Sequence, residues 1–241
     1  MAGPLQQFQI NPIIPIEFGG YDISFTNSAL WMTLAVVVTT VLMVFSMRQK
    51  ALVPGRWQNV GEILYEFISN MVQDTIGREG RKYFPFVFSI FMIVLMGNLL
   101  GMIPGSFTYT SHIIVTGVLA MVVFLGATFI GFARHGLHFF SLFVPKGLPI
   151  FILPLIFCIE VLSYLSRPVS LSVRLFANMM AGHTMLKIFA GFCVSLPIIA
   201  SIMPMLVIVA LVGFEILVAF IQAYVFAILT CVYLKDGIEL H

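Results

Sequence analysis

Charged and polar side chains lie inside one long apolar stretch of this chain, within the segment Arg167–Lys187 (RPVSLSVRLFANMMAGHTMLK). Arg174 is the most unusual of them, because apolar residues predominate for several helical turns on both sides of it. A charged side chain at the centre of a membrane helix costs about 2.5–3.5 kcal/mol on insertion scales, whereas one near a helix end reaches the interface at little cost. We therefore expect Arg174 to face a protein partner or a wet cavity and to have a function there.

The composition predicts that the whole chain lies in a membrane. Of its 241 residues, 60% are hydrophobic and 9% are charged, and the mean hydropathy is +1.07, whereas a soluble domain has about 25% charged residues. No basic run indicates nucleic acid, and the cysteines have no spacing typical of metal ligands. The N-terminus lacks the basic region of a secretory signal. We expect one membrane domain over residues 1–241, with no metal, cofactor or nucleic acid.

Apolar segments of membrane-crossing length alternate with links that contain proline, glycine or basic residues. The pattern predicts an all-α integral membrane protein with five membrane-crossing helices and one interfacial amphipathic helix. The last two crossing helices are expected to be long and strongly tilted. In chain order we expect an outer-side N-terminal arm over 1–25, a first span over 26–47, an interfacial helix over 55–76, a helix hairpin over 84–103 and 112–133, and a long hairpin over 147–196 and 204–235.

Two of these segments need more than hydropathy to interpret. In residues 55–76 apolar side chains recur at i, i+3, i+4 and i+7, which predicts an amphipathic helix lying in the membrane interface. A soluble-type helix packed on the protein remains an alternative. The segment 147–196 exceeds the roughly 30 Å thickness of the hydrocarbon core more than twofold. It must therefore tilt strongly or begin with a short broken piece.

The basic residues predict the orientation of the chain. Most of them lie in 48–82 and 131–146, whereas the links at 104–111 and 197–203 and the N-terminal arm have none. The positive-inside rule therefore places 48–82, 131–146 and the C-terminus on the cytoplasmic or matrix side. An odd number of crossings joins an outside N-terminus to an inside C-terminus, which agrees with this assignment.

The two long helices, paired as an antiparallel hairpin about a turn near residue 200, bring polar side chains together. Arg174 then falls beside Gln222, and His183 falls beside Glu215 in almost the same register. Glu160, about 320° around the helix from Arg174, lies on nearly the same face. The register predicts one acid near the inner end, one acid–imidazole pair toward the outside, and a fixed cation between them.

This arrangement predicts proton transfer by two offset half-channels. Carboxylates and imidazole exchange protons near neutral pH, whereas a guanidinium stays charged and cannot relay one. A proton could therefore reach Arg174 from either side but not pass it. Asn178 lies one turn from Arg174 on the same face. Transfer between the halves requires a mobile acid on another chain, because this chain supplies no second mobile carboxylate.

A further group of side chains is expected to be structural or secondary. Arg167 could pair with Glu160 one heptad earlier, Lys187 could reach the outer interface, and Asn98 could bond across helices. The group comprises Arg167, Ser170, Asn98 and Lys187.

At these residues the chain closely resembles subunit a of the rotary F-type ATP synthase, in the form found in mitochondria and alphaproteobacteria. The resemblance covers nearly the whole chain. It lies in SLSVRLFANMMAGH (170–183), in NLLGMIPGSFT (98–108), in Glu215 followed seven residues later by Gln222, and in Glu160. In one bacterial version of the family the residue types at His183 and Glu215 are exchanged.

The resemblance implies a non-catalytic stator subunit with no nucleotide site of its own, in the bacterial inner (plasma) membrane or the mitochondrial inner membrane. Its partners would be the c-subunit ring, b-type subunits of the peripheral stalk, the other ATP synthase subunits and the lipid bilayer. Arg174 matches the arginine that meets the ring carboxylate and separates the half-channels. The residues of the implied proton path are Glu215 and His183 on the outer side, Gln222 and Asn178 near Arg174, and Glu160 on the inner side.

Two other classes of membrane protein compete with this interpretation. A secondary transporter also has buried Arg, Glu and His, but it would show an internal repeat and two broken helices in corresponding halves, which this sequence lacks. A structural scaffold would not explain Arg174. Proton or sodium specificity and the size of the ring stay open.

Overall fold

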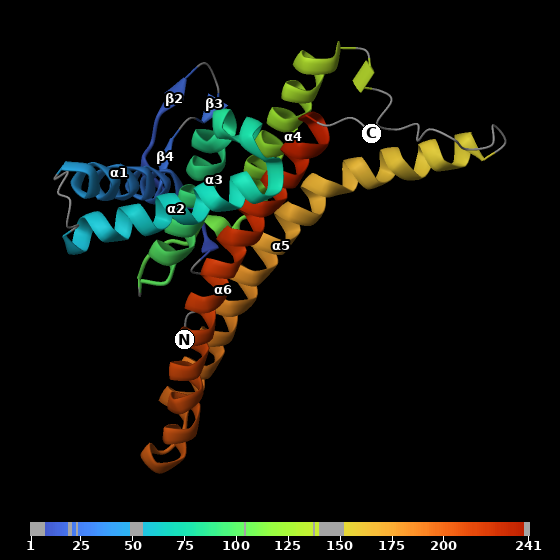
Figure 1. The fold of residues 1–241 in the computed structure, drawn as a ribbon. Helices are drawn as coiled ribbons and strands as arrows, with labels where there is room; N and C mark the ends of the chain where they lie inside the picture. The colour runs from blue at the N-terminus through green and yellow to red at the C-terminus, as the bar shows by residue number, and fades with distance from the viewer. Residues whose placement is uncertain are drawn as a thin grey trace.

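The computed structural model describes residues 8–18, 21–22, 24–48, 55–103, 105–136, 138–139 and 152–238. Within these ranges the fold is dominated by α-helices, with short strands near the N-terminus (Figure 1). The helical elements in chain order are α1 (Asn27–Arg48), α2 (Arg56–Ile76), η2 (Arg78–Tyr83), α3 (Phe84–Gly101), η3 (Tyr109–Ser111), α4 (Ile113–His135), α5 (Leu153–Ser195) and α6 (Ile198–Ile238).

The described residues contain five helices that are long and apolar enough to cross a membrane: α1, α3 together with η2, α4, α5 and α6. This confirms the predicted all-α membrane fold. The 43 residues of α5 and the 41 residues of α6 each span about 60 Å, twice the thickness of the hydrocarbon core. Neither helix can therefore stand upright within a bilayer along its whole length.

The boundaries of the long hairpin differ from those expected. Helix α6 begins at Ile198 rather than 204, and Pro204 lies inside it. Pro204 lacks the N–H that would bond to Ala200, but helical bonding is already established there, since Ser201 N donates to Pro197 O at 3.0 Å. Helix α5 begins at Leu153 with proline in its first turn, where no N–H is needed. The expected residues 147–151 lie outside the described ranges.

The N-terminal arm is more regular than expected. Strand β1 (Pro12–Ile14) pairs antiparallel with β4 (Phe25–Thr26), and β2 (Glu17–Phe18) pairs with β3 (Tyr21–Asp22). The side chain of Asn27 accepts from Asn11 N at 3.2 Å and donates to Gln9 O at 3.1 Å. These bonds attach the arm to the start of α1.

Helix α2 divides into two parts. Its second half packs into the protein through Ile68, Met71, Val72 and Ile76, which are all buried. Its first half exposes apolar side chains, with Trp57 71% exposed. The structure therefore supports an amphipathic helix that is partly packed on the protein, and its position in the membrane interface stays a prediction.

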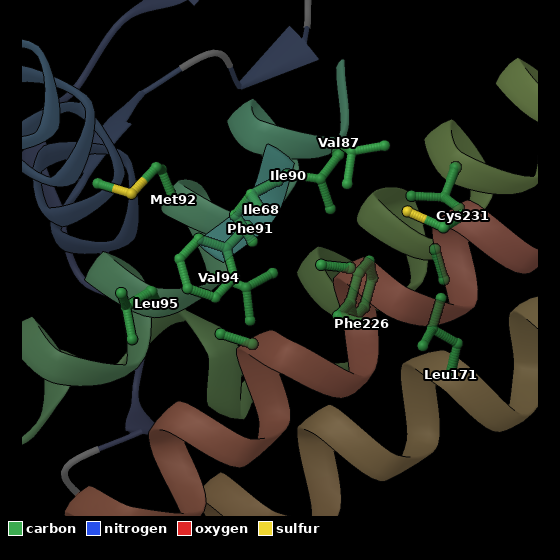
Figure 2. Packing of buried hydrophobic residues seen from close by; sticks show 14 of the residues in the cluster. Ile68, Val87, Ile90, Phe91, Met92, Val94, Leu95, Leu171, Phe226 and Cys231 are labelled. Carbon is green, nitrogen blue, oxygen red and sulfur yellow. The ribbon is translucent and has the colours of Figure 1, made fainter. Parts of the chain in front are cut away.

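The core forms where α3 and α6 meet α2, α4 and the second part of α5. Figure 2 shows Phe226 of α6 between Val94 of α3 and Leu171 of α5, all of them fully buried. Small residues allow close approach near the C-terminal end of α6, where Gly237 lies against the backbone of α4 at Ala127 and Gly131. This packing holds one side of α6 and leaves the α5–α6 hairpin to extend away from the bundle (Figure 1).

Candidate functional site

The second part of α5 runs beside α6, and the polar residues of interest lie along this contact (Figure 1). The buried residues of α5 are Pro168, Leu171, Ser172, Leu175 and Met179, at the three- and four-residue spacing of one helix face. Ser172 Oγ also lies 3.1 Å from Thr116 Oγ1 of α4, in a buried contact. These contacts fix the rotation of α5 about its axis and hence the directions of its polar side chains.

His183 of α5 and Glu215 of α6 lie in direct contact, with 2.6 Å between Nδ1 and Oε1, and they form an ion pair when His183 is protonated. The register predicted from the sequence brings these two side chains together. Glu215 is 4% exposed, which is costly for a carboxylate unless it is paired or protonated. Gly182 makes the contact sterically feasible, because a Cβ at this position would overlap the Glu215 carboxyl group.

The other side of the His183 ring is bound by the link between α3 and α4. Nε2 lies 2.9 Å from Gly101 O and 3.0 Å from Thr108 Oγ1, and Thr108 is buried. A backbone carbonyl only accepts, so Gly101 O favours a proton on Nε2, and Met179 O, 3.1 Å from Nδ1, favours a proton on Nδ1 as well. Of the two ring nitrogens, Nδ1 is the one that faces the Glu215 carboxyl group. Gly101 and Thr108 fall in the segment 98–108 that carries the family resemblance, but their contact with His183 depends on tertiary packing and was missed.

A second polar pair lies nearer the middle of the hairpin. Asn178 Nδ2 donates to Gln222 Oε1 at 3.0 Å, and Gln222 is 2% exposed. Gln222 Nε2 is buried without a partner among the described residues. A cavity of about 310 Å³ connects this pair with Glu215; its lining comprises Asn178, Ala181, Gly182, Met185, Leu211, Phe214, Glu215, Val218, Ile221 and Gln222. This volume is sufficient for several water molecules.

Arg174 is exposed, and no hydrogen bond or ion pair holds it within the part of the chain that the structure describes. Among the described residues Gln222 Oε1 accepts from Asn178 Nδ2 rather than from Arg174, and the location of Arg174 beside Gln222 stays a prediction. Exposed apolar side chains such as Val173 and Ile221 occur on both helices of the hairpin. A bare guanidinium on such a surface requires a partner of opposite charge or water.

The expected pairing of Arg167 with Glu160 is wrong. Arg167 Nη1 instead lies 2.7 Å from Asp236 Oδ2 near the end of α6. Asp236 was missed because it reaches Arg167 only through the packing of the C-terminal end of α6 beside α5. Glu160 is partly exposed on the first part of α5, and no described residue hydrogen-bonds to it.

The remaining secondary residues lie apart from this site. Asn98 is fully buried on α3, but its side-chain oxygen and nitrogen have no partner among the described residues, so the expected cross-helix bond is not formed. Ser170 and Lys187 are both exposed on α5. Neither is brought into contact with the His183–Glu215 pair.

Comparison with known proteins identifies the family of this chain. The family described as "ATP synthase A chain" matches residues 29–235. Proteins named ATP synthase subunit a are 52% identical in Paramagnetospirillum magneticum, over 100% of both chains, and 54% identical in Pelagibacter ubique, over 100% of this chain and 99% of the relative. The Rhodospirillum rubrum protein of the same name is 49% identical over 100% of both chains. The chain therefore belongs to the ATP synthase subunit a family, as a membrane-embedded, proton-translocating subunit that associates with other subunits of the synthase.

Proposed function

We propose that this chain provides two offset half-channels through which protons reach and leave the carboxylates of a c-subunit ring. The observation that carries the proposal is the buried His183–Glu215 pair at the edge of the cavity between α5 and α6. A carboxylate and an imidazole 2.6 Å apart can exchange a proton directly. Because Nε2 is bound by Gly101 and Thr108, the ring keeps its orientation when the proton on Nδ1 moves.

In the outer half-channel, protons pass from the outside through Glu215 and His183 and then reach the ring. The cavity supports this path, because Glu215 and the Asn178–Gln222 pair line the same space. Water in the cavity could bridge the approximately two helical turns between Glu215 and Gln222 on α6. A protonated ring site is neutral and can rotate into lipid without the cost of a buried charge.

Arg174 separates the two half-channels and pairs transiently with the ionised ring carboxylate. Its exposure on an apolar surface, without a partner in the described residues, supports this role. A guanidinium does not release its proton, so it blocks a direct relay while attracting the deprotonated site. The released proton leaves toward the inside by way of Glu160.

The remaining features of the proposal follow from the charge pattern and the family. The N-terminus lies outside and the C-terminus on the cytoplasmic or matrix side, in a bacterial inner membrane or a mitochondrial inner membrane. Besides the ring, b-type subunits of the peripheral stalk are the expected neighbours. One proton crossing 100 mV provides about 2.3 kcal/mol, so several protons must pass for each ATP.

The pair is tested with Glu215→Gln in membranes that contain the assembled synthase. Replacing the carboxyl group by an amide preserves the shape but removes the proton acceptor, so ATP-driven proton pumping should fall by about a hundredfold or more. Glu66→Gln on the exposed face of α2 is the matched control and should pump normally. Normal pumping by Glu215→Gln, with equal assembly, would contradict the proposed outer path.

A further inference from the structure

Helix α5 leaves the helix bundle at Arg167. The residues before it, from Leu153 onward, include no buried residue, and burial begins at Pro168. Figure 1 shows this first part of α5 projecting away while the rest of the helix runs beside α6. We call residues 153–163 the arm; it contains Glu160, and the residue that follows it, Tyr164, packs on Phe124 of α4 with 4.9 Å between the ring centres.

At this point Arg167 is held from three directions. Its guanidinium pairs with Asp236 of α6 at 2.7 Å, and it lies 5.2 Å from the ring centres of Tyr164 and Tyr233. The hydroxyl of Tyr164 lies 2.6 Å from Thr128 Oγ1 of α4. A planar guanidinium suits both contacts, because it pairs in its plane and stacks on its faces. These five residues form what we call the Arg167 clamp, which joins α4, α5 and α6.

The end of α6 that supplies Asp236 is itself fixed to α4. The imidazole of His135, at the end of α4, lies 2.9 Å from Ile238 O. Gly237 lies close to the backbone of Ala127 and Gly131, so a Cβ at this position would be in tight contact with Ala127 O, at 3.1 Å. Asp236 therefore provides a rigid anchor for Arg167.

Pro168 follows Arg167 directly and is buried. Because proline has no N–H, the carbonyl of Tyr164 lacks its usual partner within the helix, and α5 is weakened where the arm begins. The clamp bridges this weak point from outside the helix. Glu160, Arg167 and Arg174 recur at seven-residue intervals, so they lie along nearly one face of α5.

We propose that Arg167 is a positioning residue: the clamp sets the direction in which the arm leaves the bundle and so fixes Glu160 relative to Arg174. The effect of the clamp on proton transfer rests on the proposed function, whereas its effect on the direction of the arm does not. Arg167 and Arg174 thereby have opposite roles on one helix face. The first is neutralised by Asp236 within the chain, and the second stays available to a partner.

The geometric content is tested by the distance between spin labels at Leu155 on the arm and Val232 on α6, both exposed. The assembled synthase is used in membranes, with Cys158, Cys193 and Cys231 replaced so that only the two labels react. In Arg167→Gln the distance distribution should broaden or shift, whereas in the control Lys235→Gln, which changes an exposed charge beside Asp236, it should not. An unchanged distribution in Arg167→Gln overturns the proposal.

The functional content is tested by ATP-driven pumping at a series of pH values on the inner side. Arg167→Gln and Asp236→Asn should each lower pumping several-fold and shift this pH profile, with the amount of assembled enzyme unchanged. Arg167→Lys keeps the charge and should retain part of the activity. Because both residues act through one contact, the double variant should be no worse than either single variant; additive losses would overturn the clamp.

The two proposals can fail separately. If Glu215→Gln pumps normally while Arg167→Gln still displaces the arm, the half-channel proposal is wrong and the clamp stands. If the label distance is unchanged while Glu215→Gln abolishes pumping, the clamp is wrong and the half-channels stand.

Discussion

The outer and inner halves of the α5–α6 hairpin are built differently. In the half that contains His183, the imidazole has contacts on both ring nitrogens: Nδ1 faces Glu215 Oε1 and Met179 O, and Nε2 faces Gly101 O and Thr108 Oγ1. In the inner half, Glu160 is partly exposed on a segment of α5 that contains no buried residue. The chain therefore positions the residues of the proposed outer half-channel within its own fold, whereas Glu160 of the proposed inner half-channel is left to contacts with neighbouring subunits, lipid or water.

The comparison extends to the two arginines. Arg167 is paired and stacked within the chain, and Arg174 is exposed with no partner in the described residues. Both belong to one helix and nearly one face, so residue type alone does not distinguish them. The distinguishing feature is Asp236, which neutralises only the first.

Among substitutions that test the difference between the two halves, Gly182→Ala should lower ATP-driven pumping most. A Cβ at this position would overlap the Glu215 carboxyl group and push it out of line with His183. Displacement of reacting groups by about 1 Å can cost about a hundredfold in rate, so ATP-driven pumping should fall by a similar factor.

The matched control for this variant is Gly191→Ala, on the same helix, where an added Cβ meets nothing within 4 Å. It should pump and assemble normally. Equal pumping by the two alanine variants would show that the proposed outer site tolerates displacement of Glu215. The fixed position of Glu215 beside His183 would then have no role in proton transfer.

A smaller effect is expected for Thr108→Val. The substitution removes one partner of His183 Nε2 and leaves Gly101 O in place. The loss of one hydrogen bond is worth about 1 kcal/mol, or about fivefold in pumping rate. Thr108→Ser should keep the rate, and Thr33→Val serves as a control because that hydroxyl bonds only to its own helix. A rate unchanged in Thr108→Val would mean that Gly101 O alone orients the ring.

The smallest effect is expected for Lys187→Gln. Lys187 is exposed and has no partner among the described residues, and surface substitutions usually change free energies by less than about 0.5 kcal/mol, or about twofold. Pumping measured beside the parent enzyme should stay within that range. A loss of pumping as large as that of Gly182→Ala would place Lys187 on the proton path. The proposed outer half-channel would then also depend on an exposed side chain.

Local sequence signals were sufficient for the helices and for one contact between them. Apolar length predicted the spans, because membrane crossing depends on hydropathy over a window of residues. The His183–Glu215 pairing followed from the register of a single tight hairpin. Once the turn of such a hairpin is located, the residues that face each other across its two helices are determined. Pro204 was mistaken for a boundary, since one missing N–H does not end a helix that is already formed.

Contacts that depend on a third element could not be predicted. The bond from His183 to Thr108 requires the η3 region to fold back against α5, and nothing in its uncharged sequence indicates this. The pairing of Arg167 with Asp236 requires the relative position of the hairpin's inner end. Glu160 is the nearer acid in sequence, but it was the wrong partner for Arg167. A sequence shows which acids lie nearby on the same helix, but it does not show which acids a neighbouring helix brings close.

The most direct test of the account uses Arg174→Ala in membranes that contain the assembled synthase. ATP-driven proton pumping is recorded first, and passive proton leak is recorded after the soluble part of the enzyme is removed. If Arg174 separates the half-channels and meets the ring carboxylate, pumping is lost with assembly intact, and the leak is retained or raised. Normal coupled pumping would contradict the account, because the exposed guanidinium would then serve only the structure of α5.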